Sequence, residues 1–227
     1  MATRIKTLEE IGKRYPFILV DNSSLNWSSF ERIETNLLDF ERKMSISEER
    51  IKSAILFKEF LEGGKNFYIT QLILREYDRS AYYPYSKKIK NRKNNSKKNL
   101  ELHRKRREES KEIGKLARSF GENCRILELN EDERKLYDKM SRKYSFLKRK
   151  RDISEADFDF LISGAVVSRT RDLTSLISND FGIFYSWMEL LRREKLTPEK
   201  LGFFIRKDFN VFKRGKLQKN IKSFVFF

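Results

Sequence analysis

The chain has 227 residues, of which 39% are hydrophobic, so it can bury a substantial core and does not resemble a globally disordered protein. Its 50 Lys and Arg residues outnumber 33 Asp and Glu residues, and the net charge of +17 favours a polyanionic partner such as nucleic acid. A single cysteine, Cys124, excludes an internal disulfide and fits a reducing compartment. The sequence shows no signal peptide and no apolar run near the about 20 residues of a membrane span, so we expect a soluble, cytoplasmic protein that binds no membrane.

The first predicted strand ends on an acidic residue. Apolar residues at helical spacing predict a short helix around residues 5–11, and residues 17–20 (FILV) form a continuous apolar run typical of a buried strand. Asp21 follows this strand directly, and Ser23 comes two residues later. Short polar side chains often end a strand in a turn because they satisfy nearby backbone groups. Asp21 taken alone therefore indicates a turn as readily as a functional site.

A second acidic residue follows the second predicted strand. Apolar spacing predicts helices near residues 27–43 and 47–61, and residues 67–70 (FYIT) predict the next strand. The helix from residue 71 to about residue 80 carries Glu76 on its second turn, from which Glu76 can reach the end of the first strand. A Glu at such a position is more commonly an ordinary solvated residue, so it gains meaning only beside other acids.

The basic charge is concentrated in one segment. Residues 87–118 hold nine Lys and five Arg against four Glu, which gives +10 of the net charge of the chain. We expect an insertion over residues 82–120 with two helical arms that hold phosphates, although a solvated excursion is the alternative. A second basic cluster follows at residues 148–151. The candidate RNA-binding residues are Lys87, Lys88, Lys90, Arg92, Arg104, Lys105, Arg106, Arg107, Lys148, Arg149, Lys150 and Arg151.

Two further acids occur in the second half of the chain. A third strand is predicted over residues 124–129, and a helix follows it. Ser154 and Asp157 have the spacing of a capping box at the start of another helix. Residues 174–178 (TSLIS) predict a buried strand, after which Asp180 comes at the carboxyl end.

Strands that alternate with helices predict a mainly parallel sheet in an α/β fold. In such sheets, ligands bind beyond the carboxyl ends of the strands, where these acids are expected. Carboxylates that gather in one place repel one another unless cations neutralise them, and all-oxygen sites suit Mg²⁺ or Mn²⁺. The only histidine, His103, cannot make a His-rich zinc site, and the sequence lacks the glycine-rich loops of ATP and dinucleotide enzymes.

The segments FILVDNSS, ITQLILREY, ISEADFDFLISGAVV and TSLISNDFG together resemble the PIN-domain nucleases, over about residues 15–77 and 123–195. This resemblance implies a three-layer α/β/α sandwich and Mg²⁺- or Mn²⁺-dependent hydrolysis of RNA phosphodiester bonds. It implies a single domain over residues 1–227, in which residues 196–227 are a carboxyl-terminal extension. The implied catalytic and metal-binding acids are Asp21, Glu76, Asp157 and Asp180, with Ser23 and Asn179 as supporting polar groups.

Several alternatives remain open at this level. Asp159 competes with Asp157, because the two lie about 200° apart on a helix and only one can face the site; we favour Asp157 for its position at the helix start. An RNA-binding scaffold with a degenerate PIN-like fold is the second functional hypothesis, and a structure-specific DNA nuclease is the third. The sequence leaves open a homodimer, an antitoxin or another assembly partner, and the identity of the RNA.

Overall fold

The computed structural model describes residues 4–6, 8–26, 61–82, 118–207 and 223–226, together with isolated residues within 55–59 and 101–116. The helices predicted near residues 27–43 and 47–61 lie almost wholly outside this part of the chain. So does most of the predicted insertion over residues 82–120, including nearly all of its candidate RNA-binding residues. The predicted insertion begins where a described helix ends, at Tyr82.

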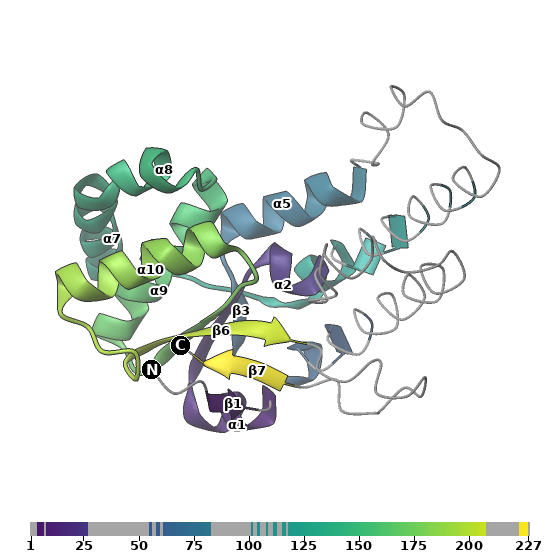
Figure 1. The fold of residues 1–227 in the computed structure, drawn as a ribbon, viewed down its shortest axis with the longest axis horizontal. Coiled ribbons are helices and arrows are strands. Elements are labelled where there is room, and N and C mark those ends of the chain that lie inside the picture. The colour runs from purple at the N-terminus through teal and green to yellow at the C-terminus, as the bar shows by residue number, and fades with distance from the viewer. Residues whose placement is uncertain are drawn as a thin grey trace.

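The strands form one seven-stranded sheet in the order β1-β7-β6-β5-β2-β3-β4 (Figure 1). Five of these strands, from β6 to β4, are parallel, whereas β7 is antiparallel to β6 and β1 is antiparallel to β7. The strands are β1 (Arg4–Lys6), β2 (Phe17–Val20), β3 (Phe67–Ile69), β4 (Arg125–Ile126), β5 (Thr174–Ile177), β6 (Leu201–Lys207) and β7 (Ser223–Phe226). The predicted α/β fold with a mainly parallel sheet is confirmed.

The strand order creates a switch point in the middle of the parallel sheet. After β2 the chain adds β3 and then β4 on one side, and it returns to add β5 and then β6 on the other side. In doubly wound sheets a crevice forms where the strand order reverses, beyond the carboxyl ends of the two strands concerned. Here these strands are β2 and β5, and their last residues, Val20 and Ile177, are register partners. Whatever follows these two residues therefore lies at the switch point of the sheet.

Seven described helices surround the sheet: α1 (Leu8–Arg14), α2 (Asn22–Asn26), α5 (Gln71–Tyr82), α7 (Glu131–Tyr144), α8 (Phe146–Arg151), α9 (Glu155–Thr170) and α10 (Phe181–Glu194). Figure 1 shows α7, α8, α9 and α10 gathered together, with β6 and β7 running between α10 and α1 in this view. Within the described part of the chain, no helix has both the length and the apolar character needed to cross a membrane.

Helix α9 is the central helix of the core. It packs against β5, β2 and β6 as well as α5, α7 and α10, so apolar residues line most of its circumference, as expected for a buried helix. Gly164 allows the close approach of α9 to the sheet, because a Cβ at this position would lie 2.5 Å from Cδ2 of the buried Leu176. This packing fixes the position of the amino-terminal end of α9, which carries Asp157.

Two predicted elements differ in the structure. The helix expected around residues 5–11 is instead strand β1 followed by α1, because β1 pairs with β7, a partner that is distant in sequence. The third strand is restricted to Arg125 and Ile126, since β4 is the edge of the sheet and has β3 as its partner. Within the predicted carboxyl-terminal extension, residues 201–207 form β6 of the parallel sheet, between β5 and β7.

A buried ion pair joins α7 to the end of α9. Glu133 is 1% exposed, and its carboxylate accepts two hydrogen bonds of 2.7 Å from the guanidinium of Arg171 and one of 2.8 Å from Thr170 Oγ1. Oε2 also accepts from the backbone N–H of Asn130, in the capping box of α7. The hydrogen bonds from Arg171 outweigh burial and lower the pKa of Glu133 to about 2. The charged form of Glu133 therefore stabilises the fold.

We expect Glu133→Gln to lower the free energy of unfolding by about 2 to 3 kcal/mol at pH 7. The pKa is about 4.5 in the unfolded chain and about 2 in the folded protein. This stabilisation is thus fully present above pH 4.5 and is lost as the pH falls through about 2, so the variant and wild type should converge on acidification. Urea unfolding at several pH values measures the difference. Glu131→Gln on the same helix removes an exposed carboxylate and should change little; an equal effect of both variants would contradict the prediction.

Candidate metal centre

Asp21 is held at the carboxyl end of β2 by two serines. It is 1% exposed, and its backbone N–H donates to the carbonyl of Ile177, which continues the pairing of β2 with β5 beyond the strand end. Oδ2 accepts from the backbone N–H and the hydroxyl of Ser23 and from the hydroxyl of Ser178, the last at 2.8 Å. One oxygen of the carboxylate is therefore fully satisfied by groups from both strand ends.

Backbone groups orient these two hydroxyls. The N–H of Asn179 donates to Ser23 Oγ at 2.9 Å, and the N–H of Asp180 donates to Ser178 Oγ at 3.1 Å. Each hydroxyl thus accepts one backbone hydrogen bond and donates its own hydrogen to Asp21. The loop after β5 presets the hydrogen bonds that fix the carboxylate.

The other oxygen of Asp21, Oδ1, is buried and has no hydrogen-bond partner among the residues that the structure describes. Burial, the negative charge of Asp157 and that of Glu76 raise the pKa of Asp21 to about 7, although the two serine hydroxyls oppose this shift. A buried acceptor without a partner is costly in a folded protein. A cation at Oδ1 would remove this cost, which makes the atom an observation in favour of a ligand at the site.

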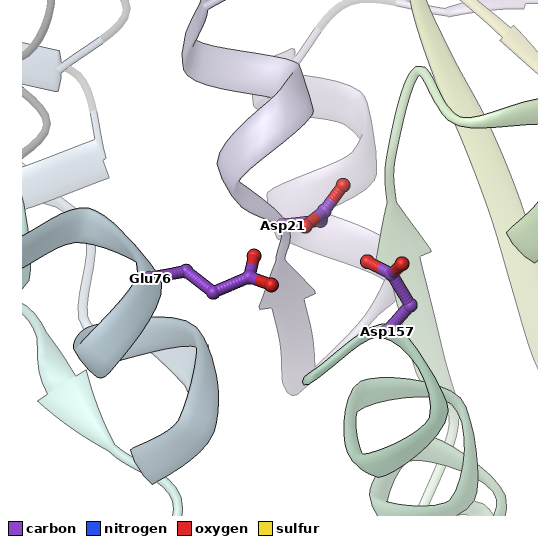
Figure 2. Close-up of side chains that lie close together, drawn as sticks. All are labelled: Asp21, Glu76 and Asp157. Carbon is purple, nitrogen blue, oxygen red and sulfur yellow. The ribbon is translucent and has the colours of Figure 1, made fainter. Parts of the chain in front are cut away.

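Glu76 and Asp157 complete a group of three acids with Asp21. Within the described residues, one ligand oxygen from each of the three lies within 4.8 Å of the other two. Figure 2 shows the three carboxylates converging from three separate elements: Asp21 from the end of β2, Glu76 from the second turn of α5 and Asp157 from the first turn of α9. Burial raises the pKa of Asp157, as does the nearby charge of Asp180. Three of the four acids predicted from the sequence thus lie close together.

Ser154 links the two partly exposed acids. It is the N-cap of α9, and its hydroxyl accepts from the backbone N–H of Asp157 at 3.1 Å and donates to Glu76 Oε1 at 3.2 Å. Asp157 Oδ2 accepts from the backbone N–H of Ser154 at 2.9 Å, which completes the predicted capping box. The residue that caps α9 thus also joins α9 to α5 at the site.

Asp180 lies at the edge of the group and not within it. It is exposed and caps α10, with Oδ1 accepting from the backbone N–H of Ile183 at 3.0 Å. Gly182 makes room for this cap, because a Cβ there would lie 2.9 Å from Asp180 Oδ1. Of the four predicted acids, three therefore share one centre, and Asp180 acts on it through its charge. Asn179 contributes its backbone N–H to the serine network.

Asp159 takes part in different contacts from Asp157. It accepts a hydrogen bond of 2.8 Å from the hydroxyl of Tyr137. Burial raises the pKa of Asp159 above its ordinary value, although hydrogen bonds from Thr70, Tyr137 and Ser163 oppose this rise. It is not a member of the three-acid group. Among the described residues it is therefore Asp157, and not Asp159, that lies close to Asp21 and Glu76.

The second basic cluster is largely engaged in ion pairs. Lys148 pairs with Glu155 at 2.7 Å, and Lys150 pairs with Glu189 at 2.8 Å. Arg151 lies 3.9 Å from the same Glu189 carboxylate, and Arg149 is exposed. In the predicted insertion, Arg104 is the one described residue among the candidate RNA-binding residues, and its side chain, 76% exposed, lies 3.7 Å from Glu108.

Sequence reasoning missed Ser178 and the role of Ser154 in the site. Ser178 opens the triplet Ser178-Asn179-Asp180 at the end of β5, and the triplet resembles the pattern that drew attention to Asp180. All four residues of β5 are buried, so the strand shows no alternation of apolar and polar positions from which the direction of the Ser178 side chain could be predicted. Ser154 was visible as a helix cap, but its bond to Glu76 joins residues 78 positions apart.

Comparison with known proteins adds no relative: no protein-family model, no characterised protein and no solved structure matches the chain. The function must be argued from the site. Three carboxylates with one unpartnered buried oxygen are a hard, all-oxygen donor set of the kind that Mg²⁺ and Mn²⁺ prefer. The residues present therefore fit a divalent cation held by Asp21, Glu76 and Asp157.

We expect Asp21→Asn to stabilise the metal-free protein at pH 8 by about 1 to 3 kcal/mol. The Asp21 carboxyl has an ordinary pKa of 3.8 in the unfolded chain but a pKa of about 7 in the folded protein, so stability falls as the pH rises between these values. The amide cannot ionise, and its NH₂ group can donate to a neighbouring carboxylate. Thermal and urea unfolding in EDTA measure the gain, which should shrink at pH 4.

Asp159→Asn is the matched control for this experiment. The pKa of Asp159 is raised by burial, without a contribution from a neighbouring carboxylate, so its replacement should give a smaller gain or a loss. Destabilisation by Asp21→Asn at pH 8 would show that repulsion among the three acids is not a significant cost in the folded protein.

We expect Ser154→Ala to weaken Mn²⁺ binding by about 10-fold or more, because the bond that orients Glu76 is lost. The variant should also lose about 1 kcal/mol of stability through the missing helix cap. Asn130→Ala removes the equivalent cap of α7 and should cost similar stability without changing metal affinity. Calorimetric titration with Mn²⁺ and urea unfolding separate the two effects; equal metal affinity in both variants would leave Ser154 with a capping role alone.

Proposed function

We propose that the protein is a metal-dependent endoribonuclease with a PIN-like fold, which hydrolyses RNA phosphodiester bonds at the centre formed by Asp21, Glu76 and Asp157. The observation that carries this proposal is the unpartnered, buried Oδ1 of Asp21 within a group of three converging carboxylates. The position of this group at the switch point of a parallel sheet supports a ligand site. The net charge of +17 and the resemblance of the sequence motifs to PIN-domain nucleases favour RNA as the substrate.

The proposed reaction adds water across one phosphodiester bond. The water oxygen bonds to phosphorus, one P–O ester bond breaks, and the leaving oxygen takes up a proton. A bound Mg²⁺ or Mn²⁺ would supply Lewis-acid activation of the phosphate and of the water. Asp21, Glu76 and Asp157 would hold the cation.

Each residue of the centre has a distinct part in preparing it. Ser23 and Ser178 hold Oδ2 of Asp21 and so direct Oδ1 to the ligand. Ser154 orients Glu76 from the start of α9. Asp157 is partly exposed, with one oxygen engaged by Ser154, which places a carboxylate between the buried Asp21 and solvent.

The positive charge of the chain would offset the repulsion between the acidic centre and a phosphate. Three carboxylates repel a phosphate, and Asp180 adds a fourth negative charge nearby. A divalent cation offsets part of this repulsion, and the excess of Lys and Arg over the whole chain raises the local concentration of nucleic acid. We propose that the basic insertion over residues 82–120 supplies much of this attraction.

We expect the wild-type protein to cleave RNA with Mn²⁺ or Mg²⁺ and to be inactive in EDTA. Asp21→Asn and Asp157→Asn should each lower cleavage by at least about 100-fold, because each removes a proposed ligand, and both should still bind RNA. Asp159→Asn should cleave nearly as well as wild type. Gel-based cleavage of structured and single-stranded RNAs, with DNAs of the same sequence, measures these outcomes.

Asp180→Asn refines the same experiment. Asn is also a good N-cap, so α10 should be retained. The loss of one charge beside Asp157 should lower cleavage by about 10- to 100-fold, less than the loss of Asp21. RNA binding without cleavage by the wild type under all metal conditions would overturn the nuclease proposal in favour of an RNA-binding scaffold, and cleavage restricted to DNA would favour a DNA nuclease.

A further inference from the structure

One face of α10 exposes three large apolar side chains. Phe181, Tyr185 and Met188 are 62%, 44% and 42% exposed, and their spacing places them on one side of the helix. The opposite side of α10 is buried, with Trp187 packed against Phe203 of β6. The core therefore fixes the orientation of α10, and the exposed face is not a consequence of loose packing.

This face begins at the rim of the three-acid centre. Phe181 directly follows Asp180, whose backbone N–H donates to Ser178 Oγ, and the Ser178 hydroxyl in turn donates to Asp21 Oδ2. Phe181 is the first residue of α10, and the cap formed by Asp180 holds it there. The apolar face thus runs from the edge of the site along α10.

A cation lies against the apolar face. The guanidinium of Arg151 lies 5.5 Å from the centroid of the Tyr185 ring. Lys150, Arg151 and Arg193 lie 2.8, 3.9 and 3.1 Å from a single carboxylate, that of Glu189. One negative charge is thus shared by three positive charges, and α8, which carries Lys150 and Arg151, packs beside α10 (Figure 1). The side of the face next to α8 thus combines the Tyr185 ring with an excess of positive charge, whereas the exposed carboxylate of Asp180 adjoins Phe181.

We propose that Phe181 and Tyr185 form a stacking platform for the bases of a single-stranded RNA segment next to the scissile phosphate. Aromatic rings beside cations suit this ligand, because the rings stack on base faces and the cations contact the phosphates. A partner with an apolar surface and no negative charge would leave the surplus positive charge without a counterpart. The proposal rests on the proposed function and extends it by defining the form of the substrate.

Single-stranded character follows from the chemistry of stacking. In a duplex, the base faces are already stacked on one another and are not available to Phe181 or Tyr185. A segment that leaves a structured region and crosses α10 could place its bases on the rings while its phosphate backbone reaches the centre. Stacking of this kind reads base faces without selecting a sequence.

Binding of fluorescent single-stranded RNA to wild type and to the double variant Phe181→Ala/Tyr185→Ala tests this proposal. The measurement is anisotropy in EDTA, where cleavage does not interfere. The double variant should bind about 5- to 150-fold more weakly for each stack that is lost. The dependence of affinity on salt should keep its slope, because no charge has been removed. Affinity for duplex RNA should not change.

Two control variants separate stacking from general damage. Phe181→Tyr/Tyr185→Phe retains both rings and should bind like wild type. Ile126→Ala truncates an exposed apolar residue on β4 and should also bind like wild type. Thermal unfolding verifies that each variant is folded.

Unchanged affinity of the double alanine variant for single-stranded RNA would overturn the proposal. So would a loss confined to duplex RNA or to single-stranded DNA. A dimer that dissociates on this substitution, measured by sedimentation with RNA affinity unchanged, would identify the face as an interface between copies of the chain. The two proposals fail through different results. Wild-type protein that binds RNA but does not cleave it would refute the proposed function. The stacking proposal is tested only by the measured affinities.

Discussion

The burial of the Asp21 carboxylate at the end of β2 is the constraint on which the rest of the site depends. One of its oxygens is satisfied by Ser23 and Ser178, and the other is buried without a partner. This arrangement requires β2 and β5 to be adjacent and parallel, since the two serines come from the ends of these strands. The sheet thus creates a position at which a negative charge is costly unless a cation joins it, and two further carboxylates increase that cost.

Helix α9 connects this site to the stability of the whole domain. Its middle packs on β5, β2 and β6, with Gly164 allowing close approach to Leu176, and its first turn brings Asp157 to the site. The cap residue Ser154 serves both the helix and Glu76. The carboxyl-terminal end of α9 leads to Arg171, which holds the buried Glu133 of α7. A helix fixed at both ends and along its length can hold a carboxylate close to other carboxylates because its packing opposes their repulsion.

Two charged regions of opposite sign occur in the described part of the chain. The acidic centre favours a cation and repels phosphate, whereas Lys150, Arg151 and Arg193 share a single carboxylate on the adjoining surface of α8 and α10. Phe181 directly follows Asp180, Tyr185 lies beside Arg151, and both offer exposed rings. Together they would allow nucleic acid to be held by its bases and its phosphates close to a centre that repels phosphates in the absence of metal.

The sequence by itself predicted several of the described elements and proposed four acids, three of which lie together in the structure. Apolar runs predicted β2, β3 and β5 within one residue, and the spacing of Ser154 and Asp157 predicted the start of α9 and the acid that faces the site. Each of these signals is local, so one stretch of chain contains it. Only the tertiary structure decided that β1 is a strand, that Asp180 caps α10 at the edge of the group, and that Ser178 and Ser154 hold Asp21 and Glu76. These features depend on contacts between residues far apart in the chain, because pairing partners and hydrogen-bond directions are set by how the strands and helices pack.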